Sequence, residues 1–380
     1  MAGIYIHIPF CKQACHYCDF HFSTSMKKKT AMVEALEKEL ILRKNEINEP
    51  IETIYFGGGT PSVLSVAEIN LLIAAVYHHF DVAENPEITL EANPDDLDKE
   101  KIIALAQTLV NRLSIGIQSF FEEDLKLMNR AHNAQEAINC LETATQYFSN
   151  ISIDLIYGIQ HMSPEHWKEN IATALSFNIP HISSYALTVE PKTALAKFIE
   201  KGIIEDVDDA LAQQHFNILT ETLEKNNFVH YELSNFGKEG FFSKNNTAYW
   251  LGKKYLGIGP SAHSFDGNNR SWNINNNSKY IQIITENKLP SEVENLSVTD
   301  RYNEAVMTGL RTVWGVSLKK ITEDFGENYV AYLLKQAKKY LEKELLIITD
   351  EASGKTLKAT QKGKFLTDGI ASDLFIIDEI

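Results

Sequence analysis

Three cysteines near the start of the chain are the residues whose types and spacing predict chemistry most directly. Cys11, Cys15 and Cys18 lie within eight residues, and Cys140 is the fourth cysteine of the 380-residue sequence. Thiolates are the usual ligands of iron–sulfur clusters, and three ligands on a four-iron cube leave one iron free to bind a small molecule. We therefore predict a [4Fe-4S] cluster on these three thiolates. Cys140, alone in a helical stretch, is predicted to be a small buried hydrophobic residue.

A structural zinc site is the alternative for the same cysteines. His16 or His21 can complete a Cys3His ligand set, and the spacing allows such a site. A single triplet without a second cysteine pair does not favour zinc. The iron–sulfur cluster therefore remains the preferred interpretation.

The elements that must position the cysteines are short β-rich runs that alternate with amphipathic helical stretches. Such alternation predicts an α/β fold with a parallel sheet, and six units predict a partial (β/α)6 barrel whose active site faces the C-terminal ends of the strands. Strands are predicted over 4–8, 51–56, 87–92, 112–117, 151–157 and 181–187, and helices over 26–46, 65–80, 99–109, 134–147 and 164–177.

The remainder of the chain divides into two further parts. A helix over 207–226 and a strand over 228–233 close the first domain, which is predicted to span residues 1–233. Residues 234–297 are rich in Gly, Asn and aromatic side chains and are predicted to form an irregular connecting region. Residues 298–380 are predicted to form a small C-terminal α+β domain with winged-helix character, its β-wing lying around Asp350 to Gly354.

Polar side chains recur where the predicted strands end. Glu91, Gln118 and Asp154 belong to apolar strand segments, Arg130 follows in LMNRAH, and glycines 57–59 follow the second strand. Carboxylates are costly in apolar strands unless they are partnered, so the polar set forms either a ligand pocket or a buried network that braces the barrel. The glycines either let a ligand approach the backbone or form a tight turn.

Composition and charge exclude several classes of protein. The net charge of -15 argues against binding of a phosphate backbone, which requires clustered Lys and Arg, so nucleic acid is not an expected partner. The amino terminus does not resemble a secretory signal, and no apolar run is long enough to span a bilayer. We expect a cytoplasmic protein without a transmembrane segment, for which peripheral membrane contact remains open. Reduced thiols in that compartment favour a metal or redox site over disulfides.

Several motifs together resemble the radical S-adenosylmethionine (SAM) proteins of the HemN/HemW family. They are YIHIPFC, the Cys-x3-Cys-x2-Cys triplet, YFGGGTPS, EANPDDL, RLSIGIQSF, NRAH, IDLIYG and GIGPSAHSF, and they run through nearly the whole chain. The resemblance implies that the open iron chelates SAM. By the same motifs it implies that a SAM pocket is lined by Tyr5, Gly58, Gly59, Thr60, Glu91, Gln118, Arg130 and Asp154.

Two features favour the HemW branch of this family over the oxidase branch. The oxidases have a fourth cysteine two positions after the third, where this chain has Phe20, and they carry an N-terminal extension, whereas ten residues precede Cys11 here. In the HemW branch, a His-Asn-x-x-Tyr-Trp motif is associated with heme. This chain has Asn245 in place of the histidine and keeps Tyr249 and Trp250.

The missing histidine leaves the iron ligand of a bound heme open. An amide replaces imidazole poorly as an axial ligand. His263 in GPSAHSF is a candidate heme-binding residue, with His230 and His215 as alternatives, although a structural role in hydrogen bonding is the commoner use of such residues. Tyr249 and Trp250 are expected to stack on a porphyrin face, or to pack within an interdomain core.

Three functions follow as hypotheses. The first is a heme chaperone that binds heme and transfers it to acceptor proteins, with no catalytic residue assigned. The second is an oxygen-independent coproporphyrinogen III oxidase, in which a radical formed from SAM starts the decarboxylation of propionates during porphyrin biosynthesis. The third is a radical SAM enzyme that modifies tRNA, against which the acidic net charge argues. The oligomeric state and the acceptor proteins are not predicted.

Overall fold

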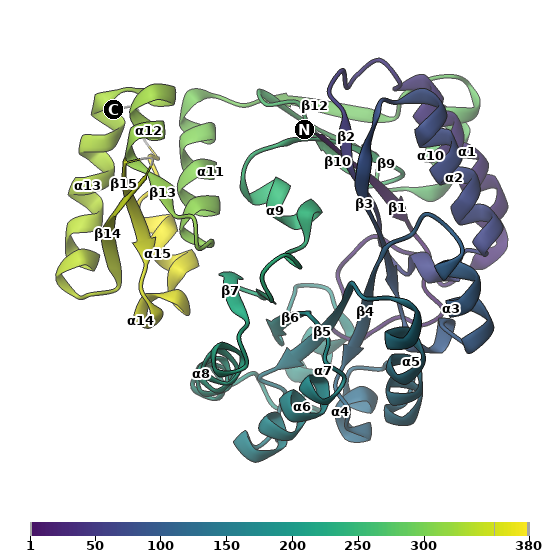
Figure 1. Ribbon diagram of the computed structural model, residues 1–380, viewed down its shortest axis with the longest axis horizontal. Helices are drawn as coiled ribbons and strands as arrows, with labels where there is room; N and C mark the ends of the chain where they lie inside the picture. The colour runs from purple at the N-terminus through teal and green to yellow at the C-terminus, as the bar shows by residue number, and fades with distance from the viewer. Residues whose placement is uncertain (1, 353, 378–380) are drawn as a thin grey trace.

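A twelve-stranded sheet dominates the computed structural model, which describes residues 2–352 and 354–377. Its centre consists of six parallel strands that lie side by side in chain order, and their outer face is covered by helices (Figure 1). The predicted partial (β/α)6 barrel is therefore confirmed. The six strands are β1 (Ala2–Ile8), β2 (Ile51–Gly58), β3 (Val82–Ala92), β4 (Arg112–Gln118), β5 (Ile151–Tyr157) and β6 (His181–Ala186).

The covering helices begin where the sequence supplies capping residues. Ser65 and Glu68 form a reciprocal capping box at α2, and the Ser163 side chain accepts a hydrogen bond from the backbone of His166 at α6. The helices are α1 (Lys29–Leu42), α2 (Val66–His79), α3 (Lys99–Ala106), α4 (Glu122–Leu127), α5 (Ala134–Tyr147), α6 (Pro164–Ser176), α7 (Ala194–Glu200) and α8 (Asp209–Lys225), with short 3-10 turns at Met26–Lys28, Pro61–Val63 and Pro94–Asp96. Cys140 is buried in α5, as predicted.

The expectation that residues 234–297 are irregular is wrong. These residues add strands to both edges of the main sheet: β8 pairs with β6 at one edge, and β9 pairs in parallel with β1 at the other. The strands are only three to five residues long and lie between Gly- and Asn-rich turns, so they show little periodicity in the sequence. This part of the sheet and its helices comprise β7 (Val229–Glu232), β8 (Asn235–Gly237), α9 (Lys244–Trp250), β9 (Lys254–Ile258), β10 (His263–Phe265), β11 (Asn269–Asn273), α10 (Asn277–Thr285) and β12 (Ser291–Asn295).

The C-terminal region forms a second body with a hydrophobic core of its own, built around side chains such as Tyr302, Leu333 and Leu357. A small antiparallel sheet with the order β13-β15-β14 packs against helices. The predicted wing is the β14–β15 hairpin, of which Ser353 lies outside the described residues. The elements are α11 (Val298–Leu310), β13 (Val316–Ser317), α12 (Leu318–Phe325), α13 (Glu327–Glu342), β14 (Leu346–Glu351), β15 (Gly354–Ala359), α14 (Gln361–Lys364) and α15 (Thr367–Asp373).

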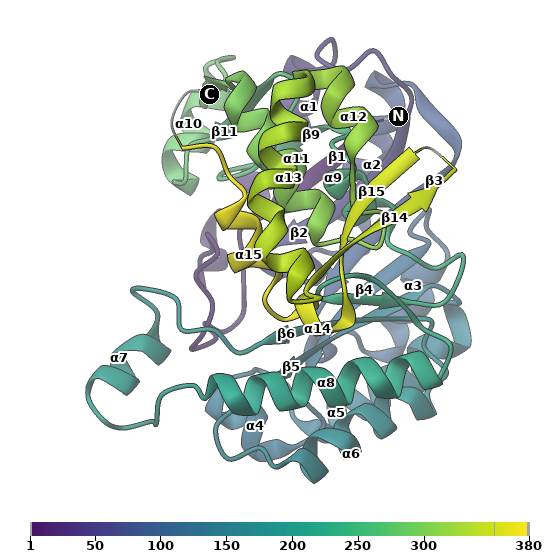
Figure 2. The ribbon, with the colours of Figure 1, turned by 90° about the vertical axis from the view of Figure 1, so that its left-hand side faces the viewer.

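A short segment after α11 joins the two bodies. The Val313 backbone N–H donates to the Tyr231 carbonyl over 2.9 Å, and the Arg311 guanidinium donates to the buried Glu232 carboxylate over 3.0 Å. Helix α9 lies between the concave side of the sheet and the C-terminal body (Figure 1), and α7 extends away from the barrel (Figure 2). Within the described residues, none of the helices combines the length and the apolar composition needed to cross a membrane.

Candidate functional site

The three cysteines lie on the cluster loop, which we define as residues 9–25 between β1 and the 3-10 turn before α1. Backbone hydrogen bonds fold this loop back on itself, because the Cys11 N–H donates to the Ser23 carbonyl and the Ser23 N–H donates to the Pro9 carbonyl. Helix α7 holds the loop from outside through a bond from the Leu195 N–H to the His16 carbonyl, 2.8 Å long. The loop therefore presents its thiols from a braced backbone.

The arrangement of the thiols does not suit a single metal ion. A tetrahedral zinc ion with Zn–S bonds of about 2.3 Å brings its sulfurs within about 3.8 Å of one another. Over the described residues, the groups whose ligand atoms all lie within 4.8 Å include Glu123, Asp124 and His166 but not the three cysteines. His16 and His21 each contact a neighbouring group through one ring nitrogen, the Leu127 carbonyl and the Asn277 side chain, a pattern that metal-bound histidines also show, so the distinction rests on the thiols. Three separated thiols suit a larger cluster.

The glycines after β2 allow close packing against the cluster loop. A Cβ atom on Gly59 would lie 2.7 Å from the Phe10 carbonyl oxygen, and one on Gly58, whose φ is +106°, would lie 2.5 Å from the His7 ring. The Gly59 N–H donates to the Ile8 carbonyl, and the Thr60 N–H donates to that of Phe10. Glycine is therefore required at these positions in part because a side chain would clash with β1 and the cluster loop.

Arg130 links the cluster loop to the ends of the strands. Its guanidinium donates to the Cys15 sulfur over 3.3 Å, to the Asn93 side chain over 2.7 Å and to the Gly116 carbonyl over 2.9 Å. The Arg130 Nε atom is buried and has no hydrogen-bond partner among the described residues. An unsatisfied cationic donor beside the cluster loop is chemically suited to an anionic group such as the carboxylate of an amino acid.

Two carboxyl groups lie deeper in the barrel, on β3 and β5. Glu91 accepts a hydrogen bond of 2.7 Å from the Tyr55 hydroxyl, and burial raises the pKa of Glu91 to about 7 against the effect of that bond. Burial also raises the pKa of Asp154 to about 6, while a hydrogen bond from Ser183 opposes the shift. Both groups therefore change charge near neutral pH.

Tyr5 and Gln118 lie near these carboxyls. The Tyr5 ring stacks against that of Tyr55 at a centroid distance of 6.0 Å. Gln118 lies where β4 bulges, with a φ of +67° that is uncommon for a residue with a side chain. The structure thus brings Tyr5, Gly58, Gly59, Thr60, Glu91, Gln118, Arg130 and Asp154 to one side of the sheet or its C-terminal edge, where the cluster loop lies.

Asn245 points into the barrel rather than toward a ligand surface. Its side chain is buried and accepts a hydrogen bond of 3.2 Å from Thr53, and its carboxamide oxygen lies 3.6 Å from the position of a Cβ atom on Gly3. Its backbone N–H donates to the buried Glu87 carboxylate. Asn245 therefore lies beside the first half of β1, whereas the cluster loop begins after Ile8, about 16 Å further along the strand at 3.3 Å per residue.

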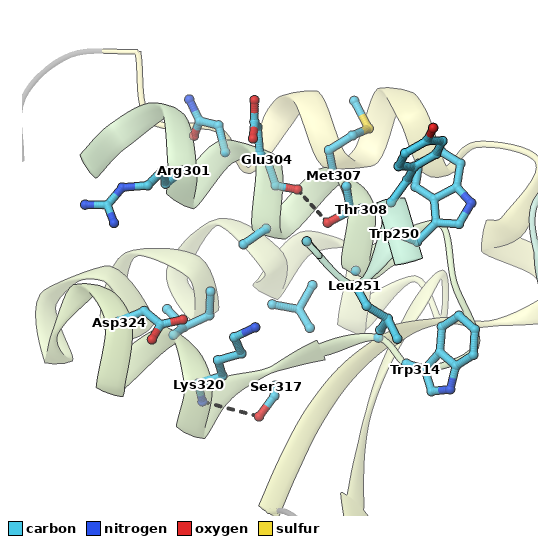
Figure 3. A pocket seen from close by; sticks show the side chains of 18 of the residues that line it. Trp250, Leu251, Arg301, Glu304, Met307, Thr308, Trp314, Ser317, Lys320 and Asp324 are labelled. Atoms are coloured by element: carbon cyan, nitrogen blue, oxygen red, sulfur yellow. Dashed lines mark hydrogen bonds between the residues drawn. The ribbon is translucent and has the colours of Figure 1, made fainter. Parts of the chain in front are cut away.

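Tyr249 and Trp250, later on the same helix, border a large cavity between the two bodies. This interdomain cavity measures about 1360 Å³. Figure 3 shows Trp250 and Trp314 at one end and Arg301, Lys320 and Asp324 at the other. Of the described residues that line it, the first along the chain is Tyr249, so the interdomain cavity shares no lining residue with the cluster end of the barrel.

The candidate histidines lie away from the interdomain cavity. His263 is exposed at the start of β10, where its ring centroid is 6.0 Å from that of Trp272. His230 is buried against Phe236, and His215 is buried in α8, where its Nδ1 atom contacts the backbone N–H of Gly158. His215 and His230 therefore pack within the fold, which agrees with the structural role that the sequence left open for them.

Sequence patterns did not reveal several residues that shape the two sites. Tyr55 and Asn93 contact Glu91 and Arg130 directly, and each belongs to a quoted motif, YFGGGTPS or EANPDDL, although neither was singled out as a site residue. In the interdomain cavity, Met307 and Trp314 come from the C-terminal body. Nothing in their spacing connects them to Trp250, because only the docking of the two bodies brings them together.

Comparisons with known families agree with this geometry. The model of the Radical SAM superfamily matches residues 5–174, and that of the HemN C-terminal domain matches residues 296–366. In fold, the Escherichia coli coproporphyrinogen III oxidase HemN, a radical SAM enzyme, resembles the chain with a TM-score of 0.81 at 24% identity, covering 98% of this chain and 90% of that one. The sheet and the cysteine loop are thus those of a radical SAM protein.

Sequence relatives narrow the assignment. The heme chaperone HemW of Bacillus subtilis is 33% identical over 371 residues, covering 96% of this chain and 97% of that protein. HemW of Lactococcus lactis is 34% identical with the same coverage. A mouse protein, the mitochondrial radical S-adenosyl methionine domain-containing protein 1, is 34% identical over 69% of this chain and 60% of its own length. The chain belongs to the HemN/HemW family of radical SAM proteins.

Membership of this family implies a [4Fe-4S] cluster and SAM. The donor set fits the cluster, since three thiols on one braced loop leave one iron of a cube without a protein ligand. The unsatisfied Arg130 Nε atom fits a carboxylate next to that iron. Burial raises the pKa of the Cys11 and Cys18 thiols to about 11, and metal coordination would deprotonate them.

Proposed function

We propose that this chain is a radical SAM protein that binds heme and transfers it to acceptor proteins. The observation that carries the proposal is that Tyr249 and Trp250 line the interdomain cavity, which has no lining residue in common with the cluster end of the barrel. A radical abstracts hydrogen only from an atom in contact with it, at about 3–3.5 Å. Tyr249 interacts electrostatically with Tyr5 and Glu91, but the other described lining residues are not among those that surround SAM, so a tetrapyrrole in the interdomain cavity is proposed to be held and not attacked.

Cys11, Cys15 and Cys18 hold the cluster in this proposal, and Tyr5, Gly58, Gly59, Thr60, Glu91, Gln118, Arg130 and Asp154 surround SAM. The cluster, when reduced by an external electron donor, would supply the one electron needed to cleave bound SAM. Arg130 orients the SAM carboxylate, since its guanidinium is already fixed by Asn93 and Gly116. Ionised Glu91 and Asp154 attract the positive charge of SAM, and Tyr55 holds the Glu91 carboxylate in place.

The oxidase hypothesis has less support. Phe20 stands where the oxidases have their fourth cysteine, and its side chain is 68% exposed. The likeness to E. coli HemN concerns the fold, whereas relatives named heme chaperone match over almost their whole length. We also propose a reducing, cytoplasmic setting, because the four cysteines are free thiols. His263 is proposed as a heme contact only secondarily, since it lies outside the interdomain cavity.

The proposal is tested on one anaerobically reconstituted sample. Heme is titrated into the protein, and the shifted Soret band is expected to saturate at one heme per chain. Transfer to an apo-form of a heme enzyme is then followed by the recovery of that enzyme's activity. SAM-dependent conversion of coproporphyrinogen III to protoporphyrinogen IX, without a stoichiometric heme complex, would overturn the proposal in favour of the oxidase.

A further inference from the structure

The interdomain cavity has an apolar, aromatic end. Trp250 and Trp314 lie there (Figure 3), and Leu251 and Val313, both 41% exposed, also face the cavity. Large apolar side chains left exposed together in a concave site usually mark a binding surface. The volume of about 1360 Å³ exceeds the roughly 300–1,000 Å³ of pockets for drug-sized molecules, so the cavity has room for an occupant larger than such molecules.

The opposite end of the interdomain cavity is charged. Arg301, Lys320 and Asp324 lie there (Figure 3), and the Arg301 Nε atom is buried without a hydrogen-bond partner in the described part of the chain. Other charged lining groups form ion pairs: Arg270 pairs with Glu304 over 2.9 Å, although its Nε atom, like that of Arg301, is buried without a partner among the described residues. In the same way, Lys358 pairs with Glu351, and Asp300 caps α11. Arg301 is thus a guanidinium with donor capacity to spare for a carboxylate.

Few of the side chains that line the interdomain cavity could ligate the iron of a heme. Neither histidine nor cysteine is among the described residues that border the interdomain cavity, and the one sulfur there belongs to Met307. Asn245 cannot contribute, because its side chain is turned into the barrel toward Thr53. Tyr249 and Tyr255 also line the cavity, but burial raises the pKa of both hydroxyls and opposes the phenolate form that ligates iron. An occupant is therefore recognised mainly by its faces and its acidic groups.

We propose that the interdomain cavity binds a porphyrin dicarboxylate, with the ring between Trp250 and Trp314 and a carboxylate on Arg301, and that iron is not needed for recognition. This inference rests on the proposed function and names the chemistry of its site. Metal-free porphyrin and heme present the same ring faces and the same two carboxylates, so the site does not distinguish them strongly. Asp324 opposes the carboxylates, which keeps binding reversible enough for transfer.

The test compares three ligands on the full-length, cluster-containing protein: heme, metal-free protoporphyrin IX and its dimethyl ester. Heme and the free porphyrin are expected to have dissociation constants within about threefold of each other. Loss of one aromatic face in Trp250→Leu or Trp314→Leu should weaken both about tenfold, and Asp324→Asn should strengthen both. Arg301→Gln should weaken both acids about fivefold but leave the ester unchanged, and Arg301→Lys should recover part of the loss.

Tyr77→Leu is the control, because Tyr77 is an exposed aromatic residue on α2 and lies outside the interdomain cavity. It should leave all three dissociation constants unchanged. Tight binding of heme with no binding of metal-free porphyrin would overturn the inference and leave the proposed function standing. If both ligands bind and the cavity variants leave their dissociation constants unchanged, the inference is also overturned and the proposed function still stands. If neither ligand binds, the proposed function itself fails.

Discussion

The cluster end of the barrel and the interdomain cavity differ in how closely their residues are packed. Around the cluster loop, Arg130 alone makes hydrogen bonds to a strand carbonyl, an asparagine and a cysteine, and glycines pack the backbones of β2 and the loop together. In the interdomain cavity, the half-buried Trp250 and Trp314 and the exposed Leu251 and Val313 border open space, while each region keeps one buried arginine Nε donor unpaired, that of Arg130 or of Arg301. The first region is organised to hold a fixed cofactor, and the second to accept and release a ligand.

The origin of the residues differs as well. The cluster end takes its residues from successive strands of one parallel sheet, each following the last by one βα unit. The interdomain cavity takes Trp250 from α9 and Trp314 from the C-terminal body. Arg311 joins the parts, since it pairs with Glu232 of β7 and lies over the Trp250 ring. If the regions are as independent as this contrast indicates, substitutions in one should leave the binding properties of the other nearly intact.

The largest expected effect comes from removing a cluster ligand. Cys15→Ala should abolish the [4Fe-4S] cluster and all SAM cleavage, because two thiolates do not retain the cube. Heme binding should change by less than about twofold, since Cys15 does not line the interdomain cavity. Iron and sulfide analysis, SAM cleavage and heme titration on the same sample measure both regions. A heme affinity that falls with the cluster would show that the two regions are coupled.

Docking of the C-terminal body should be the next most sensitive feature. Arg311→Met leaves the buried Glu232 carboxylate without its cation, and breaking a buried pair in this way costs about 3–5 kcal/mol. Because Arg311 is partly exposed and its guanidinium lies 5.2 Å from the Trp250 ring centre, we expect about 3 kcal/mol and weaker porphyrin binding. Thermal unfolding should show a lower first transition, with cluster content retained.

Two variants control for that effect. Lys319→Met removes an exposed pair with Glu323, which is worth at most about 1 kcal/mol, so it should leave the unfolding profile nearly unchanged. Adding Glu232→Gln to Arg311→Met removes the unpaired charge and should restore part of the stability. An Arg311→Met protein as stable as the parent would mean that other contacts hold the two bodies together.

Sequence reasoning was most successful where chemistry follows the strand order. Glu91 and Asp154 could be predicted as neighbours because parallel strands bring their side chains to one side of the sheet. By contrast, the pairing of β9 with β1 could not be read from residues 254–258, since a five-residue strand has little periodicity and its partner lies about 250 residues away. Likewise, no local pattern indicates that Trp314 lies near Trp250, because that depends on how the two bodies dock.

A smaller effect is expected at the cluster end itself. Arg130→Lys keeps the charge but loses the planar fork that reaches Asn93, Gly116 and Cys15 together. We expect SAM affinity to fall about tenfold, which corresponds to the loss of one charge-assisted hydrogen bond of roughly 1.5 kcal/mol. Equilibrium binding of SAM to the reconstituted protein measures this change. Lys126→Gln, an exposed substitution on α4, should bind SAM normally, and heme affinity should be unchanged in both variants.

A further expected effect is a dependence of stability on pH that belongs to Glu91. Its pKa is about 7 in the folded protein, above its ordinary value of about 4.3, so the folded state holds a proton that the unfolded state releases between these values. Stability from this group is therefore fully present below about pH 4 and is lost as the pH rises toward 7. Glu91→Gln stays neutral throughout and can still accept the Tyr55 hydrogen bond.

Relative to the parent protein without SAM, Glu91→Gln should gain several degrees in melting temperature at pH 8 and little or nothing at pH 5. Glu84→Gln on the same strand replaces an exposed carboxyl and should shift the two temperatures equally. An equal shift for Glu91→Gln at both pH values would mean that the carboxyl is already ionised or well solvated. In that case, the contrast between a tightly packed cluster end and an open interdomain cavity would be weaker than the contacts of Glu91 indicate.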